Sequence, residues 1–541
     1  MDKGDYDTRV YEMIASGPYE EYLYKNGKPK DPLNAMIEGA NITRQRTAHL
    51  MGEEKLERRL LVSNPKVASL YCLPKIHKNP LAMRPISSNV STSMEKMAAW
   101  VVNEMKHYPI SHGASVKNSV DLVEQLKGVE LRMGEILVSF DVKALFPSVP
   151  VPDAIQSFRG HLERSRASSI QIEAYTSIVE RCMDQNFFTF RGKFYRQVFG
   201  LCMGSKLSPL LAELFMSDFE GKLKEEKFFP RVWKRYVDDV FAIVEERHLE
   251  QTLELLNTRY PTIKFTVEQE VDKKLPFLDL IISRKPDNSL KFGIYRKPTS
   301  TDRYITSDSN HCGAQKQAAF HSMAHRLVSV PMEKDEYTIE KEKIKKAAKL
   351  NGYDEDFVEK IIRTHERKQH KREVTNLQPE KENLERISMP FYAKVTNRIK
   401  NALKRHGYHV THKSENRLRD LLCNAKDKIP SNEKSGIYKI ECQDCAAVYI
   451  GQTRRKFKVR LKEHKKAVAN KRANESSVAS HAISLQHNVD WDNAKILKNI
   501  RKSSQLNAWE SMHIMTSEQP LMNEDDAPIL SPLFHLTKLK L

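Results

Sequence analysis

Apolar and polar residues alternate along this chain at intervals that predict a mixed α and β architecture. The segment 135–150 (EILVSFDVKALFPSVP) predicts a buried strand, because the apolar residues Ile136, Leu137, Val138 and Phe140 lead directly to Asp141. The residues that follow predict, in order, a helical region over 152–186, a hairpin over 187–197 that turns at Arg191-Gly192, a helix over 208–223 with Pro209 in its first turn, and two half-strands over 231–244 joined at Asp238-Asp239.

The regions on either side have different patterns. Helical spacing occupies 37–60, whereas 61–88 alternate short apolar runs with proline and predict strands and turns. Residues 333–385 are highly charged and predict helices, and the pattern weakens over 378–390, as expected for a linker or hinge. From Gly436 the strand pattern returns in GIYKIEC and AAVYIGQT, and a basic helix, KFKVRLKEHKKAV, is predicted after them.

Composition narrows the class of protein. The chain has 541 residues, of which 40% are hydrophobic and 8% aromatic. These values exclude wholesale disorder or a fibrous repeat and predict about two to four domains. No apolar run approaches the ~18–20 residues that span a bilayer, and the first residues lack the apolar core of a secretion signal. The seven cysteines are mostly scattered, which predicts a reducing compartment.

Positive charge is concentrated in the last third of the chain. The whole sequence has 89 Lys+Arg and 70 Asp+Glu, and residues 391–472 alone contain 22 of the former and 7 of the latter, so 22 − 7 = +15. A basic concentration of this kind favours nucleic acid as the partner, through release of counterions. The alternative is a solvated lysine-rich surface.

Three carboxylates stand in unusually apolar surroundings. Asp141 follows the apolar run of its strand, and Asp238 and Asp239 lie side by side within YVDDVFAIV. Burying unpaired carboxylates costs several kcal/mol each, and divalent cations such as Mg2+ are the usual compensation. An ordinary hairpin turn is the alternative for the adjacent pair. The combination of YVDD, an apolar-strand aspartate and a Gly-x(3)-Ser-Pro segment resembles the palm of reverse transcriptases.

The resemblance implies roles for several residues. FDVKALF resembles the first catalytic motif, which makes Asp141 a metal ligand and Phe146 the residue that blocks a ribose 2′-hydroxyl; a core phenylalanine is the alternative. GLCMGSKLSPLLAELFM resembles the second motif, in which Gly204 allows close approach to nucleotide and template and Ser208 begins the supporting helix, although Cys202 replaces the more usual proline. Asp238 and Asp239 form the third motif.

The family's fingers supply basic contacts to triphosphate or template where Lys75 and Arg84 stand in this chain, with surface cations as the alternative. The implied chemistry is nucleotidyl transfer with Mg2+ or Mn2+, dNTPs, a DNA primer and an RNA template. In that chemistry the metals lower the pKa of the primer 3′-hydroxyl and neutralise the leaving pyrophosphate.

A second signature lies near the C-terminus. GIY at 436–438 and YIG at 449–451 resemble the core of the GIY-YIG nucleases. The resemblance implies that Tyr438 and Tyr449 position or deprotonate the attacking water. It also implies that Arg460 stabilises the charge of the phosphorane, that Glu510 holds a divalent metal, and that Asn523 buttresses the site. His464, one turn after Arg460, either assists or is a surface residue of the basic helix.

A cysteine pair lies between the two tripeptides. Cys442 and Cys445, with His481 and His487 downstream, can form a tetrahedral Zn2+ site, although 35 residues separate Cys445 from His481 and an ordinary zinc finger is excluded. A reverse transcriptase palm with a C-terminal GIY-YIG domain that carries Cys-Cys-His-His resembles Penelope-like retroelements. LPKIHK, RYVDD, LPFLDLII and RKPTSTDRYITSDSNH are also similar to that family.

The sequence therefore predicts an α+β multidomain protein. The predicted parts are an N-terminal helical or partial fingers region (1–60), reverse transcriptase fingers and palm (61–290), a thumb-like helical region (291–385), a basic linker (386–432) and a small α/β GIY-YIG endonuclease domain (433–530). The expected function is that of a Penelope-like RNA-directed DNA polymerase whose nuclease nicks target DNA to supply the primer.

The alternative is an N-terminally truncated or domesticated copy that binds nucleic acid without turnover, because Met1 begins partway into the family's N-terminal region. Nuclear localisation, with some protein in the cytoplasm, is expected from the DNA substrate, and KQHKRE at 368–373 is a weak targeting signal. No membrane partner is expected.

Overall fold

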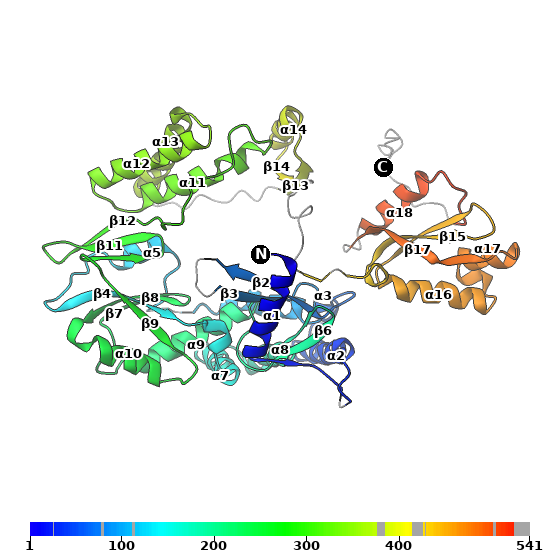
Figure 1. Ribbon diagram of the computed structural model, residues 1–541, viewed down its shortest axis with the longest axis horizontal. Coiled ribbons are helices and arrows are strands. Elements are labelled where there is room, and N and C mark those ends of the chain that lie inside the picture. Colours follow the sequence, from blue (N-terminus) through cyan, green and yellow to red (C-terminus); the bar gives the residue numbers. More distant parts are fainter. Residues whose placement is uncertain are drawn as a thin grey trace.

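A computed structural model describes residues 1–24, 26–76, 81–110, 114–375, 385–413, 426–427, 429–500 and 505–523. Within these ranges the strands form five sheets, and helices cover them or connect them (Figure 1). No helix in these ranges combines the length and the apolar character that crossing a bilayer requires.

The central sheet is antiparallel and has the order β7-β8-β4-β9. Its strands are β7 (Val232–Tyr236), β8 (Asp239–Glu245), β4 (Glu135–Val142) and β9 (Phe265–Gln269). The predicted strand that leads to Asp141 is confirmed as β4. Because successive side chains of a strand point to opposite faces, Val138 and Phe140 lie on one face and Leu137 on the other.

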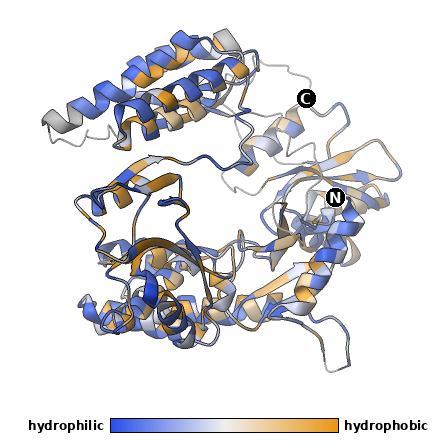
Figure 2. Cartoon of the chain, turned by 60° about the vertical axis from the view of Figure 1, so that its left-hand side comes forward, coloured by the Kyte–Doolittle hydropathy of each residue, from blue (hydrophilic) through white to orange (hydrophobic). Residues whose placement is uncertain are grey.

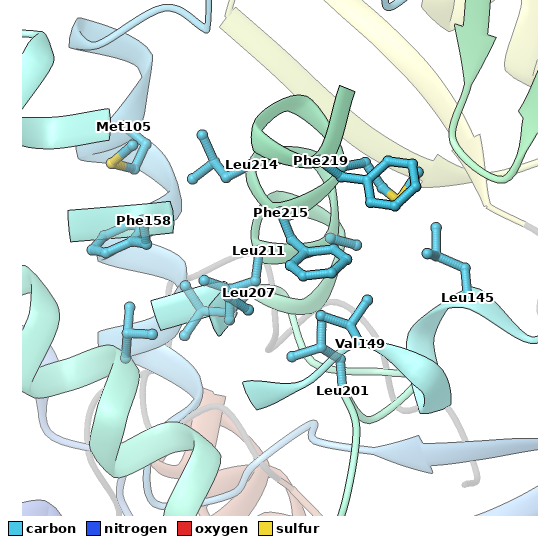
Figure 3. Close-up of a cluster of buried hydrophobic side chains, with 14 of the residues drawn as sticks. Met105, Leu145, Val149, Phe158, Leu201, Leu207, Leu211, Leu214, Phe215 and Phe219 are labelled. Carbon is cyan, nitrogen blue, oxygen red and sulfur yellow. The ribbon is translucent and has the colours of Figure 1, made fainter. Parts of the chain in front are cut away.

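The Val138 face packs on helices. These are α7 (Val151–Arg164), α8 (Ser169–Asp184) and α9 (Ser208–Leu223), which confirm the predicted helical regions. Figure 3 shows Leu211, Leu214, Phe215 and Phe219 of α9 among apolar side chains of neighbouring elements. This helix is therefore held on several sides, and its position relative to the sheet is fixed by packing.

The Leu137 face is covered over most of its length. Leu137 packs with Phe241 and Ile243 of β8 and with residues of a three-stranded sheet made of β10 (Lys274–Phe277), β11 (Leu280–Arg284) and β12 (Leu290–Ile294). Asp141 and Asp239 lie on the same face of the sheet as Leu137, because Asp141 follows Ser139 by two residues and Asp239 precedes Phe241 by two. The carboxylates consequently emerge where the apolar rows of this face end.

A five-stranded sheet of order β1-β6-β5-β2-β3 forms a separate layer, called here the N-terminal sheet. Its strands are β1 (Tyr19–Glu21), β6 (Lys193–Gln197), β5 (Phe187–Phe190), β2 (Ala68–Lys75) and β3 (Ala82–Ser88), and α1 (Lys3–Ser16) packs on it through Tyr6, Val10 and Ile14. The hairpin predicted over 187–197 is confirmed by β5 and β6. Residues near the N-terminus thus share a core with later strands.

Three helices follow β12 along the chain: α11 (Gly313–Ser329), α12 (Lys334–Leu350) and α13 (Glu355–Thr375). Phe320, Leu327 and Ile362 belong to their common core, and hydrophilic residues alternate with hydrophobic ones along the helices (Figure 2). Lys291 of β12 forms ion pairs with Glu333 and Glu336, which join this three-helix unit to the sheet below it.

The region predicted as a basic linker contains regular structure. Strand β13 (Glu385–Pro390) pairs in parallel with β14 (Tyr408–Lys413), and α14 (Ala393–Arg405) connects them. Residues 414–425 and 428 of the predicted linker lie outside the described residues. The sequence analysis named this region only as a basic linker and did not identify the βαβ unit, because a unit of this size gives only a short periodic signal.

The last described domain has a three-stranded antiparallel sheet of order β16-β15-β17. Strands β15 (Gly436–Cys442) and β16 (Val448–Thr453) confirm the two predicted strands, and α16 (Phe457–Ala469) confirms the basic helix. Strand β17 (Val489–Asn499) and helices α17 (Ser477–Ser484) and α18 (Leu506–Met515) complete the domain.

Candidate active sites

The three aspartates of the central sheet are brought together by strand register. Asp141 of β4 lies directly opposite Asp239 of β8, and the amide of Val142 donates a hydrogen bond of 3.0 Å to the carbonyl of Asp238. Tyr236 pairs with Asp239, so the two-residue turn is Val237-Asp238 and Asp239 is the first residue of β8. The predicted turn was one residue too far along the chain.

This arrangement concentrates negative charge. Partial burial, and next the charges of Asp238 and Asp141, raise the pKa of Asp239 to about 6. Lys297, in the segment after β12, acts in the opposite direction. Carboxylates that repel one another at the end of an apolar face are suited to divalent cations, which take carboxylate oxygens and remove the repulsion. The residues that fit this role are Asp141, Asp238 and Asp239.

The loop before α9 depends on glycine. Gly204 has φ +124°, and a Cβ atom there would lie 2.0 Å from the carbonyl oxygen of Ser87 in β3. The amide of Ser87 donates a hydrogen bond of 2.8 Å to the carbonyl of Met203, so this loop lies directly against the N-terminal sheet. The close approach that glycine permits here is to another strand; contact with nucleotide or template stays a prediction.

Ser208 closes the same loop. Its side chain is buried, and its hydroxyl donates a hydrogen bond of 2.6 Å to the carbonyl of Cys202 at the other end of the loop. Ser208 therefore fixes the start of α9 through the backbone. Any contribution of this residue to nucleotide binding acts through the shape of the loop.

The other predicted nucleotide-binding residues lie on separate elements. Phe146 follows β4, is half-buried against the central core, and accepts a hydrogen bond of 2.7 Å at its carbonyl from the amide of Leu201. Lys75 and Arg84 lie on the same face of the β2–β3 hairpin, since Leu73 pairs with Arg84 and Lys75 pairs with Ala82. Arg84 is exposed on that face. The roles of these three residues toward nucleotide stay predictions.

The tyrosines of the C-terminal domain are adjacent across two strands. Tyr438 of β15 pairs with Gly451 of β16, and its ring centre lies 6.0 Å from that of Tyr449. A Cβ atom at Gly451 would lie 2.7 Å from Tyr438 Oη and 2.6 Å from Tyr449 Cε1. Glycine is therefore required where the two rings meet the backbone, which gives a physical reason for YIG in the motif.

Tyr438 is fully buried and its hydroxyl meets two side chains of α16. Arg460 Nε donates a hydrogen bond of 3.3 Å to Tyr438 Oη, and His464 Nε2 lies 2.8 Å from the same oxygen. On its other side, His464 Nδ1 lies 2.6 Å from Ser476 Oγ. His464 is itself buried, so the alternative of a surface histidine was wrong.

Burial controls ionisation in this group. Desolvation, followed by the charge of Arg460, lowers the pKa of His464 to about 4, so the ring is neutral near pH 7. Desolvation, followed by Tyr449, raises the pKa of Tyr438. Arg460 donates to Tyr438 Oη, and the two nitrogens of the neutral His464 ring each have a hydroxyl partner, Tyr438 Oη and Ser476 Oγ.

The two remaining predicted residues are held on the β16 side of the sheet. Glu510 of α18 accepts a hydrogen bond of 2.7 Å from Gln452 Nε2 of β16. Asn523 makes two hydrogen bonds to Ile450, accepting from its amide at 3.1 Å and donating to its carbonyl at 2.7 Å. The contacts of Asn523 have the geometry of a buttress for β16, and metal binding by Glu510 stays a prediction.

The Cys-Cys-His-His set converges in space. The ligand atoms of Cys442, Cys445, His481 and His487 all lie within 4.8 Å of one another. Cys442 Sγ lies 3.6 Å from His487 Nδ1, Cys445 Sγ lies 3.6 Å from His481 Nε2, and the two nitrogens are 3.3 Å apart. Tetrahedral zinc with its usual bond lengths separates such atoms by about 3.3–3.8 Å, so the donor set fits this metal.

Two residues near these sites were not assigned from the sequence. Lys297 lies within RKPTSTDRY, a stretch quoted only for its similarity, and its effect on the pKa of Asp239 shows that it lies near the carboxylates. Ser476 has no sequence signal, because it follows His464 by twelve positions and approaches it only through the packing of α17 on α16.

Three family models match the chain. The reverse transcriptase (RNA-dependent DNA polymerase) model matches residues 76–272, the animal helix-turn-helix domain model matches 303–363, and the GIY-YIG catalytic domain model matches 434–522. The first covers the three aspartates, and the third covers both tyrosines and Glu510. The second covers much of the three-helix unit. No curated protein matches the chain.

Solved structures with a similar arrangement include two telomerases. The telomerase of Candida albicans in complex with a fragment of telomeric RNA has a TM-score of 0.41 at 12% identity, covering 64% of this chain and 58% of that one. The apo telomerase of Candida tropicalis has a TM-score of 0.35 at 12% identity, covering 57% and 59%. The chain thus spans less than two thirds of the length of these proteins.

Proposed function

We propose that this chain, a reverse transcriptase joined to a GIY-YIG nuclease in the arrangement of Penelope-like retroelement polyproteins, nicks target DNA with its C-terminal domain and extends the freed 3′ end on an RNA template. One observation supports the proposal: a single chain holds two groups of candidate catalytic side chains, one around Asp141 and Asp239 and one around Tyr438 and Glu510. Tethering them delivers the primer end at high effective concentration.

The central site performs the synthesis step. Mg2+ or Mn2+ bound by Asp141, Asp238 and Asp239 would lower the pKa of the primer 3′-hydroxyl and neutralise charge on the phosphates. The chain itself fixes the angle between the carboxylates through the β4–β8 register. Half-buried Phe146 would favour deoxynucleotides by excluding a 2′-hydroxyl, and Lys75 and Arg84 would contact triphosphate or template.

The C-terminal site performs the nicking step. Tyr438 and Tyr449 would orient the attacking water, and the hydrogen bond between Tyr438 Oη and His464 Nε2 would hold the phenol in position. Arg460 would stabilise the charge that develops on the phosphorane. A divalent cation at Glu510 would polarise the scissile phosphate. Zinc held by Cys442, Cys445, His481 and His487 would have a structural role, because four protein ligands leave no open position.

The βαβ unit that precedes the nuclease is suited to follow a phosphate backbone. Residues 385–413 contain seven Lys+Arg and one Glu. Arg398, Lys404 and Arg405 are exposed, and no carboxylate of the described residues forms an ion pair with them. Exposed Tyr392 offers an aromatic surface for a base. We expect Lys404→Glu with Arg405→Glu to weaken DNA binding and to reduce its salt dependence.

Two separate assays test the proposal. Primer extension on an RNA template with dNTPs and Mg2+ is expected from the purified chain and is expected to be lost in Asp239→Ala, which keeps nicking. Nicking of supercoiled DNA is expected to be lost in Glu510→Ala, which keeps extension. A folded chain that binds primer–template without extending it would favour the non-catalytic binding copy, and loss of both activities in both variants would contradict two independent sites.

From the DNA substrate we also propose that the chain acts in the nucleus. A fluorescently tagged chain that stays outside the nucleus would contradict this.

A further inference from the structure

A buried arginine lies directly behind the carboxylate hairpin. Arg235, the residue before YVDD, is only 1% exposed, and its side chain lies on the helix-facing side of β7 with Trp233. Its guanidinium holds two glutamates of α9: Nη1 and Nη2 donate to Glu213 at 2.9 and 3.0 Å, and Nε and Nη2 donate to Glu220 at 2.5 and 3.2 Å. Trp233 Nε1 also donates to Glu220, at 2.9 Å.

The same guanidinium reaches the turn itself. Arg235 Nη1 lies 3.4 Å from the carbonyl oxygen of Val237. Val237 has φ +58°, a left-handed conformation that a β-branched residue adopts only when its surroundings impose it. The backbone of Arg235 is fixed as well. Its amide donates a hydrogen bond to the carbonyl of Ala114, and its carbonyl accepts one from the amide of Val116, both at 2.8 Å. The turn that carries Asp238 is therefore held from behind.

Helix α9 continues the connection to the N-terminal sheet. Its first turn is fixed by the hydrogen bond of Ser208 to Cys202, and the preceding loop lies against Ser87 of β3 through Met203 and Gly204. A continuous series of contacts thus runs from β3 through α9 and Arg235 to the carboxylate turn. Each contact is a packed or hydrogen-bonded one, as a mechanical connection requires.

We propose that Arg235 is a positioning residue that sets the metal affinity of the Asp238-Asp239 turn by tying it to α9, and through α9 to the β3 strand. This inference rests on the proposed polymerase function. Lysine cannot replace arginine in this role, because only a planar guanidinium has enough donors in a fixed fork to hold two carboxylates and a carbonyl together. Arg235 itself touches neither substrate nor metal.

The test compares Arg235→Lys with a control substitution at Arg231, next to the far end of the same strand. Arg231, just before β7, makes a similar two-point ion pair with Glu135 at 2.7 and 3.0 Å but lies at the opposite end of the strand from the turn. We expect Arg235→Lys to raise the Mg2+ concentration for half-maximal primer extension by about 10–100-fold, as for other residues that orient metal ligands. Arg231→Gln is expected to leave that concentration unchanged, and both variants are expected to nick DNA normally.

A binding readout separates this inference from the proposed function. Mn2+ binding, followed by electron paramagnetic resonance in a Glu510→Gln background, is expected to weaken in Arg235→Lys and not in Arg231→Gln. If the wild type fails to extend a primer, Mn2+ binding still decides the role of Arg235. An unchanged Mg2+ or Mn2+ dependence in folded Arg235→Lys would overturn the inference. If Arg235→Lys does not fold, Glu213→Gln, which keeps the shape of the glutamate side chain, serves in its place. We expect Glu213→Gln to shift the metal dependence in the same direction by a smaller factor. An unchanged metal dependence in folded Glu213→Gln would overturn the inference.

Discussion

Tyr438 and His464 share a hydrogen bond of 2.8 Å in the interior of the C-terminal domain, between a phenol on β15 and a neutral imidazole on α16. Neither group is accessible enough to exchange its proton with solvent freely. The imidazole is also held from its far side by Ser476, whose Oγ lies 2.6 Å from His464 Nδ1. The pair therefore holds the Tyr438 hydroxyl in a fixed position through a buried side chain of α16.

Replacing His464 should affect nicking alone. We expect His464→Phe, which keeps the aromatic volume, to lower the nicking rate by about 10²-fold, because Tyr438 loses the side chain that positions its hydroxyl. Because the pKa of His464 is lowered to about 4, its protonation should not reduce nicking between pH 6 and 8. Plasmid nicking across that range measures both effects. Unaltered primer extension is the control, and a histidine-dependent loss of nicking below pH 6.5 would contradict the assignment.

Asp239 should weaken the metal-free fold. Its pKa of about 6 exceeds the value of ~3.9 in an unfolded chain, so between these values the native state binds more protons. Stability contributed by the protonated carboxyl is complete below pH 4 and is lost as the pH rises through 6. We expect Asp239→Asn to raise the free energy of unfolding in EDTA by about 1–2 kcal/mol at pH 7 and to leave it unchanged at pH 4. Denaturant unfolding at both pH values measures this, and an equal gain at both would be inconsistent with a charge effect.

Gly204 should be intolerant of any side chain. Alanine there would have both an unfavourable φ and a Cβ atom 2.0 Å from the carbonyl oxygen of Ser87. We expect Gly204→Ala to destabilise the chain by about 3 kcal/mol or more, because the loop must move away from β3. Gly134→Ala is the matched control, since it has φ +81° with nothing within 4 Å of the added atom. Equal losses in thermal unfolding would show that conformation alone, and not the contact with Ser87, determines the cost.

The sequence was informative wherever function imposes local motifs or strong periodicity. Strand β4, helix α9 and the β15–β16 pair were predicted from apolar patterning, and Asp141, Tyr438 and Tyr449 lie on the predicted strands. The turn register at Val237 could not be predicted, because propensity disfavours valine at positive φ and the tertiary contacts of Arg235 override it. The roles of Ser476 and Glu220 depend on helix packing that no local pattern reports.

Loss of the cysteine–histidine site should abolish nicking and leave synthesis intact. Cys442 ends β15, the strand that carries Tyr438, and His487 lies just before β17, so the four ligands join the end of β15 to the start of β17. We expect Cys445→Ser to lose bound zinc, which elemental analysis of the purified chain measures, and to lose nicking because β15 and β17 are no longer held together at that end.

The control for this change is Cys312→Ser, since Cys312 is also buried but precedes α11, outside the cluster. That variant is expected to keep one equivalent of zinc and both activities. Primer extension by Cys445→Ser should match the wild type, because the central sheet shares no ligand with the cluster. Zinc that remains bound in Cys445→Ser would place the metal elsewhere in the chain and contradict the assignment.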